Sequence, residues 1–277
     1  MSHHILLIGG HGKVSQLLTP LLLSRSWNVT SVVRTAEQKP TIEALGKDQP
    51  GKLDVLVSSV SDVKNESDAK SIIDRVKPDW VVWSAGAGGK GGVSNTIAVD
   101  HDAAIAFTKA SIHTPNVKKF LTVSYLSSRR GVPSWWSEED AKTAKKTNEE
   151  ILPTYYKAKV AADEVLTVLS RERLEKEIKN GVPEKERFAG ISLRPGGLTD
   201  EKAGGVKVGR IGAGAKTSRD TTAHAIVAAL ETGFKGWLDV IDGDEDPKSA
   251  IQKLADQGVD TAEEEDWEAA KERVSKL

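Results

Sequence analysis

Short apolar runs alternate with longer amphipathic stretches along the first half of the chain. Apolar residues recur at helical spacing between Val14 and Leu22, directly after the first run. The runs predict five strands, with the clearest signal of a buried strand in the first: 5–8, 28–33, 53–57, 80–83 and 119–123. The stretches between them predict helices near 14–22, 36–46, 69–76 and 94–111, with a glycine loop at 86–92. This alternation predicts a doubly wound α/β fold, a parallel sheet with helices on both faces.

The second half of the chain has a less regular pattern. Residues 128–154 are polar, carry Trp135 and Trp136, and predict an inserted surface segment or lid. Beyond it we expect a strong helix from 155 to 169 with a charged extension to 180, and then a strand at 188–193. A helix at 221–232 and a strand at 237–241 follow. The last predicted element is a C-terminal helix whose first turn holds the acidic run 263–266. No linker marks a clear domain boundary.

Composition removes several classes of function. The 277 residues carry 39 basic and 40 acidic side chains, a net charge of -1, which argues against a nucleic-acid partner. The absence of cysteine excludes disulfides, thiolate metal sites and a cysteine nucleophile, and no metal site is predicted. No stretch reaches the roughly 18 apolar residues of a membrane helix. We therefore expect a cytoplasmic protein that has no membrane partner.

A glycine turn follows the first predicted strand and opens the first predicted helix. Its sequence is Gly9-Gly10-His11-Gly12-Lys13. Gly9 suits a turn with positive φ, and Gly12 lets the backbone approach a diphosphate, which the N–H groups of the helix N-terminus would bind. A plain tight turn is the alternative. The position between strand and helix favours a dinucleotide site.

The end of the second strand bears on which dinucleotide binds. NAD sites usually place an acidic residue there to bind the ribose 2′-hydroxyl. This chain has Arg34 instead. A guanidinium can bind a 2′-phosphate through two hydrogen bonds, and Lys13 adds positive charge nearby. Although a solvated surface arginine is the alternative, the pattern favours NADP (NADPH) over NAD.

A tyrosine and a lysine stand four residues apart in the helix predicted from 155. Tyr155 and Lys159 therefore share one helix face. A neighbouring ammonium and a nicotinamide cation would lower the pKa of a phenol toward the neutral range, so that Tyr155 could act as an acid or base. Ser124, at the end of the fifth strand, is the candidate for a hydrogen bond to a substrate oxygen. Ser127 is an alternative, and a strand-end cap is the structural interpretation of either serine.

In this order, these motifs resemble the short-chain dehydrogenase/reductase superfamily, and most of all its atypical, epimerase/dehydratase-like and NmrA-like branch. The resemblance covers about residues 4–230. It implies a catalytic position for Asp100, where most members carry asparagine. It also implies that two further segments contact the cofactor: Ser84, Ala85 and Gly86, and Arg194, Pro195 and Gly196. The fold it implies is a single Rossmann-type domain over 1–277, in which residues from about 195 contribute a small substrate lobe.

The resemblance supports two classes of function. The first is an NADP-dependent oxidoreductase of a small carbonyl or alcohol, or an epimerase or dehydratase that uses the same groups. Tyr155 would be the acid or base, Lys159 its modulator and ribose anchor, and Ser124 a substrate contact. The second is a non-catalytic NADP(H) sensor that acts through a protein partner, a hypothesis motivated by the aspartate at position 100. A sugar-nucleotide enzyme ranks below both, because no basic diphosphate cluster is evident in the C-terminal part. The sequence predicts no oligomeric state.

Overall fold

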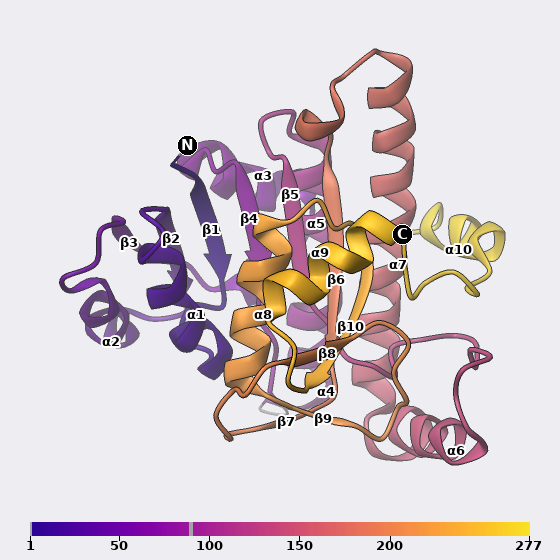
Figure 1. Cartoon of the computed structure of the whole chain (residues 1–277). Helices are drawn as coiled ribbons and strands as arrows, with labels where there is room; N and C mark the ends of the chain where they lie inside the picture. The colour runs from indigo at the N-terminus through magenta and orange to yellow at the C-terminus, as the bar shows by residue number, and fades with distance from the viewer. Residues whose placement is uncertain (1, 89–90) are drawn as a thin grey trace.

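A twisted sheet runs through the centre of the molecule (Figure 1). The computed structural model describes residues 2–88 and 91–277; residues 89 and 90 of the expected glycine loop lie outside this range. Within it, the sheet has eight strands in the order β3 (Leu53–Val57), β2 (Asn28–Val33), β1 (His4–Ile8), β4 (Trp80–Trp83), β5 (Lys119–Val123), β6 (Ala189–Pro195), β10 (Gly236–Asp242) and β8 (Val206–Val208). All neighbours pair in parallel except β8, which runs antiparallel to β10. The predicted doubly wound α/β sheet is confirmed.

Alternate residues of each central strand enter different cores. In β1, Ile5 and Leu7 pack into one cluster, whereas Leu6 and Ile8 pack into the other. All four side chains are fully buried. This is the pattern of a strand covered on both faces, where a continuous apolar run replaces the alternation of apolar and polar residues.

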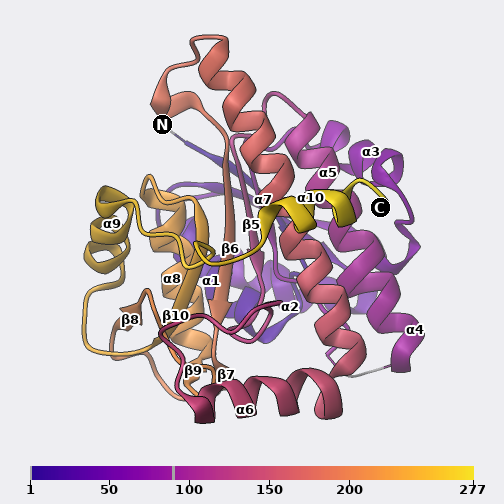
Figure 2. The same cartoon turned by 90° about the vertical axis from the view of Figure 1, so that its right-hand side faces the viewer.

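Helices cover both faces of the sheet (Figures 1 and 2). One face carries α1 (Lys13–Leu23), α8 (Arg219–Glu231) and α9 (Pro247–Gln257), and the other carries α3 (Glu66–Val76), α5 (Ala104–His113) and α7 (Pro153–Lys179). The last helix, α10 (Trp267–Val274), packs on α7, while the short α2 (Lys39–Glu43) lies against β3. In the part of the chain that the structure describes, no helix is both long and apolar enough to cross a membrane.

Two predicted helices are interrupted in the structure. The stretch expected to be helical at 94–111 consists of α4 (Gly92–Thr96), a π-helix (Ile97–Ala103) and α5. The stretch at 36–46 is α2 flanked by 3₁₀ turns at Ala36–Gln38 and Ala44–Gly46; further 3₁₀ turns are Val60–Asp62 and Glu184–Glu186. The placement of the acidic run was wrong in part, because α10 begins at Trp267 with Asp266 as its N-cap, so that residues 263–265 precede the helix.

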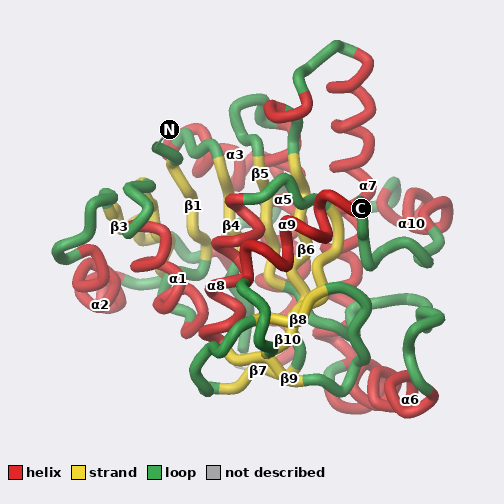
Figure 3. The backbone as a smooth tube through the Cα atoms, viewed as in Figure 1, coloured by secondary structure: helices red, strands yellow, loops and turns green. Residues whose placement is uncertain are grey.

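The polar segment before α7 packs against the loop that leads into a second, smaller sheet. This segment, residues 128–152, contains α6 (Glu138–Lys146) and a π-helix (Thr147–Ile151). The Trp136 indole donates to the Ile211 carbonyl at 2.8 Å, and the Gly214 N–H donates to Asp140 at 3.4 Å. The smaller sheet pairs β7 (Gly197–Thr199) with β9 (Lys216–Ser218). Figure 3 shows the segment and this strand pair at the end of the molecule where the parallel strands terminate.

Candidate active site

The glycine turn lies where the chain reverses its direction of winding across the sheet. β1 lies between β2 and β4, so the connections leave it on opposite sides, the place where open α/β sheets bind ligands. The turn is closed by a hydrogen bond from the Gly12 N–H to the Gly9 carbonyl at 2.9 Å. Gly9 has φ +87°, and a Cβ there would lie 2.6 Å from the Ala85 backbone. Glycine is therefore required, and the turn packs directly on the 84–86 loop after β4.

The first turn of α1 presents unused hydrogen-bond donors. Its N-cap is Gly12, which supplies no capping side chain, and the first turn holds no acidic residue. Among the described residues, no backbone acceptor pairs with the N–H groups of Lys13, Val14 or Ser15. Free N–H groups at a positive helix end bind anions. The predicted site residues Gly9, Gly10 and Gly12 thus form a cradle that fits a diphosphate.

Two predicted cationic residues lie near this cradle in different surroundings. Arg34 is exposed immediately after β2, and within 2–88 and 91–277 its guanidinium has no ion pair. Its backbone N–H donates to Gln38 at 2.8 Å, which holds the strand end in place. Lys13 is also exposed but pairs with Asp200 at 2.9 Å. Arg34 is therefore free to bind an anion, whereas Lys13 already contacts one.

Asp100 lies behind the 84–87 loop, on the π-helix. It is 1% exposed, and its Oδ2 accepts a hydrogen bond from the Ala87 N–H at 3.0 Å. Its Oδ1 is buried without a partner among the described residues and lies on the side of Gly86, where a Cβ would be 3.2 Å away. Burial raises the pKa of the Asp100 carboxyl, although the positive charge of Lys159 acts in the opposite direction. The structure thus brings together Asp100, Lys159 and the 84–86 loop.

Tyr155 lies in the first turn of α7 with a free hydroxyl. The side chain is half-buried, and its ring packs on Tyr125 with ring centroids 5.3 Å apart. Its hydroxyl makes no hydrogen bond to any residue in the described part of the chain. Burial raises the pKa of Tyr155 strongly, and the negative charges of Asp100 and Asp163 raise it further. In the chain alone, burial and the two carboxylates therefore set the pKa of Tyr155. The expected lowering, which also involves the nicotinamide cation, stays a prediction.

Lys159 is turned toward the end of β5. It is 1% exposed, and its Nζ donates to the Val123 carbonyl at 2.8 Å. Tyr155 and Lys159 lie one helical turn apart on α7, a rise of about 6 Å. Lys159 therefore spans the space between Asp100 and the last residue of β5, which fixes its position without the help of Tyr155.

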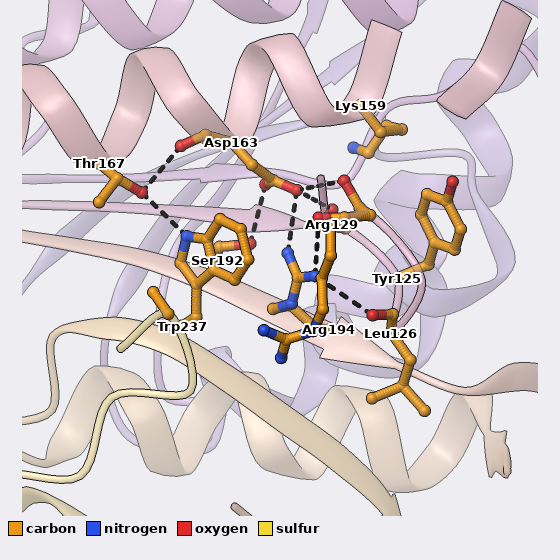
Figure 4. A network of polar contacts seen from close by, with 12 residues as sticks. Tyr125, Leu126, Arg129, Lys159, Asp163, Thr167, Ser192, Arg194 and Trp237 are labelled. Carbon is orange, nitrogen blue, oxygen red and sulfur yellow. Dashed lines mark hydrogen bonds and ion pairs between the residues drawn. The ribbon is translucent and has the colours of Figure 1, made fainter. Parts of the chain in front are cut away.

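Ser124 belongs to a buried network centred on Asp163 (Figure 4). Its hydroxyl donates to Asp163 Oδ2 at 2.5 Å, and Ser128 donates to the same oxygen at 2.7 Å. Ser192 donates to Oδ1 at 2.8 Å. The proton of the Ser124 hydroxyl is therefore already in a hydrogen bond, and its lone pairs are the part left for a substrate. The alternative, Ser127, is buried, and its carbonyl accepts a hydrogen bond from Asn148.

The predicted Arg194-Pro195-Gly196 segment lies mostly below the surface. Arg194 is fully buried, donates to Asp163 and Asp239 at 3.1 Å each, and stacks on Trp237. The N–H of Gly196 donates to Thr217 Oγ1 at 2.7 Å, and a Cβ at Gly196 would lie 2.3 Å from the Ala215 carbonyl oxygen. The segment thus ties β6 to the smaller sheet, and the Arg194 guanidinium does not reach the surface.

The sequence interpretation missed Asp163. A signal was present, because Asp163 follows Lys159 by four residues. Asp163 and Glu164 are the two charged residues in the otherwise apolar stretch from Val160 to Leu166. Four hydrogen-bond donors from two other parts of the chain, residues 124–128 and β6, converge on it: Ser124, Ser128, Ser192 and Arg194. Only the fold brings these donors together, so spacing within one helix could not identify them.

Comparison with known proteins agrees with this geometry. Residues 9–233 match the family of NAD(P)H-binding domains, and the chain belongs to this family. The match begins at the glycine turn and ends just after α8, so it includes the cradle and all the site residues described above. The class of protein is therefore a nicotinamide-dinucleotide-binding protein.

Individual relatives extend the likeness over most of the chain. UPF0659 protein C216.03 of Schizosaccharomyces pombe is 29% identical over 223 residues, 79% of this chain and 81% of that protein. The uncharacterized sugar epimerase YhfK of Bacillus subtilis is 28% identical over 256 residues, 90% of this chain and 99% of that one.

Solved structures show the same fold. A putative NAD-dependent epimerase/dehydratase from Bacillus halodurans superposes with a TM-score of 0.67 at 21% identity, covering 92% of this chain and all of that one. ChuY, an anaerobillin reductase from Escherichia coli O157:H7, has a TM-score of 0.59 at 19% identity, with 88% and 99% covered.

Proposed function

We propose that the protein is an NADP-dependent oxidoreductase that acts on a small carbonyl compound or alcohol. The observation that carries this proposal is a free phenol hydroxyl, that of Tyr155, one helical turn from the buried Lys159, at the end of the sheet that carries the glycine cradle. Family membership supports the nicotinamide cofactor. The free guanidinium of Arg34 at the end of β2 supports NADP as the preferred form.

The chain provides distinct contacts for each part of this cofactor. The N–H groups that open α1 would hold the diphosphate, and Arg34 would pair with the 2′-phosphate. The 84–86 loop packs against the cradle and would border the nicotinamide side. When bound, the nicotinamide supplies or accepts the hydride. We propose that Pro195 and Gly196 contribute through the backbone and that Arg194 positions them from below.

Tyr155 would act as the proton donor. Because its pKa is raised, the phenol is neutral at pH 7 and can donate a proton to the oxygen of a carbonyl substrate. Lys159 holds a positive charge near Asp100 and so limits the negative charge around the reacting oxygen. Ser124, whose own proton is bonded to Asp163, would accept a hydrogen bond from the product hydroxyl.

The surrounding segments suit a small-molecule site. We propose that residues from about 195, which form β7 and β9, act as the substrate lobe, and that the 128–152 segment acts as a cover fixed to it by Trp136. An epimerase would use the same groups and return the hydride within one turnover. Two relatives carry epimerase names. A non-catalytic sensor is not favoured, since those names are names of enzymes. We expect a cytoplasmic enzyme with no nucleic-acid partner.

Removal of the Tyr155 hydroxyl tests the proposal. Tyr155→Phe should lower the rate of NADPH oxidation with a panel of small aldehydes and ketones by at least about 100-fold, because the proton donor is lost. Tyr156→Phe is the matched control. It removes the same group from the next residue, whose hydroxyl donates to the Arg129 carbonyl, and should retain turnover. Turnover that survives in Tyr155→Phe would refute the role of Tyr155.

A further inference from the structure

An acidic side chain bridges two cations next to the glycine cradle. Asp200 follows β7 and pairs with Lys13 Nζ at 2.9 Å and with Arg219 Nη1 at 2.7 Å. Lys13 is the first residue of α1, and Arg219 is the first residue of α8. The two helices pack side by side on one face of the sheet. Figure 1 shows the loop after β7 passing below the lower ends of both.

The charges at this point require an anion. Both cations stand at the positive ends of helices, where the helix dipole disfavours positive charge. α8 has Asp220 in its first turn and a capping side chain, Ser218, but α1 has neither. The hydrogen bond from Lys13, together with the positive charges of Lys13 and Arg219, keeps the pKa of Asp200 below its usual value. Asp200 therefore supplies, as a carboxylate, the negative charge that the start of α1 lacks.

A bound dinucleotide would bring the same charge to the same place. Lys13 directly follows Gly12 in the cradle that the proposed function assigns to the diphosphate. A carboxylate and a diphosphate held by the same cations repel each other. Both pairs are open to solvent through Asp200, which is 64% accessible, while Lys13 is 67% and Arg219 23% accessible. Such pairs are weak, so a diphosphate with more charge can displace the carboxylate.

We propose that Asp200 is a built-in competitor of the cofactor diphosphate: it occupies Lys13 and Arg219 until the dinucleotide binds, and its displacement releases residues 200–202. This inference rests on the proposed function and adds Arg219 to the site. The release is limited in extent, because the N–H of Ala203 donates to Asp220 at 3.0 Å and fixes the next part of the loop to α8.

Binding measurements on the full chain test this competition. Asp200→Asn removes the competing charge and should lower the dissociation constants of NADPH and NADH by about threefold to tenfold each, because both carry the diphosphate. Glu201→Gln is the matched control: it removes one charge from the next residue, which has no ion pair within the described parts of the chain. It should change both constants less than twofold. Titration followed by tryptophan quenching gives the values.

Trypsin cleavage after Lys202 supplies a second measurement. In the unmodified chain, NADPH should speed this cleavage, because it frees the residues around Asp200. In Asp200→Asn, cleavage should be fast without nucleotide. Unchanged or weaker nucleotide binding in Asp200→Asn would overturn the inference. A chain that binds neither dinucleotide would instead contradict the proposed function. In that case the binding of inorganic pyrophosphate to the two proteins tests the inference. Tighter binding by Asp200→Asn than by the unmodified chain supports it, and equal binding overturns it.

Discussion

Arg34 is the residue on which the choice of cofactor depends. It is exposed at the end of β2 and has no ion pair in 2–88 or 91–277. Arg34→Ala should therefore weaken NADPH binding by about 10- to 100-fold, the value of one or two charge-assisted hydrogen bonds. NADH, which has no 2′-phosphate, should change less than about threefold. Parallel titrations with the two nucleotides measure this difference, and equal losses for both would assign Arg34 a structural role.

Asp100 is the residue whose protonation links the site to stability. Its pKa is raised by burial, so the folded protein favours the protonated form. The stability that this group contributes is complete below its unfolded value of 3.8 and is lost as the pH rises through the higher, folded value. Asp100→Asn mimics the protonated form. Its free energy of unfolding should exceed that of the unmodified chain increasingly from pH 4 to pH 8.

Urea unfolding across this pH range tests the expectation for Asp100. The difference between the two proteins should be small at pH 4 and should favour Asp100→Asn at pH 8. A difference that stays constant with pH would mean that Asp100 has the same pKa in both states. A difference of the opposite sign would mean that the charge of Lys159 outweighs burial.

At the scale of elements, the sequence predicts what depends on local pattern. The strands 5–8, 28–33, 53–57, 80–83 and 119–123 were located correctly because each is a short run rich in apolar and β-branched residues. The sequence pattern predicted no helix at α9. The buried apolar residues of this helix, such as Ile251, are few and are separated by polar residues. The helix at 94–111 was predicted as continuous because its π-helical segment leaves no mark on residue spacing.

In the candidate site, too, residue spacing predicts the features that lie within one element but not the contacts between elements. The glycine cradle and the Tyr155–Lys159 pair lie within single elements, so spacing could identify them. The bonds that decide what Ser124 and Lys13 contact could not be found this way: their partners Asp163 and Asp200 are 39 and 187 positions away in sequence. Burial, which sets the pKa of Tyr155, is likewise a property of the folded chain.

At the scale of the whole molecule, two buried arginines join separate parts of the chain. Arg194 in β6 and Arg129, after β5, both donate to Asp239 in β10, at 3.1 and 2.6 Å. Arg129 also donates to the Thr261 carbonyl in the C-terminal part. Arg194 also donates a hydrogen bond to Asp163 on α7. One network therefore connects the central strands, α7 and the C-terminal segment beneath the candidate site.

Asp239 is the point at which this network can be broken with least change of shape. It is fully buried and accepts hydrogen bonds from Arg194, Arg129 and Thr261. Asp239→Asn keeps the size but leaves two buried guanidinium groups short of one negative charge, which should lower the free energy of unfolding by about 3–5 kcal/mol. Asp74→Asn, which breaks an exposed pair with Lys70, should cost no more than about 1 kcal/mol. Urea unfolding followed by tryptophan emission measures both. A loss below about 1 kcal/mol for Asp239→Asn would show that the network adjusts locally and does not hold β6, β10 and the C-terminal segment together.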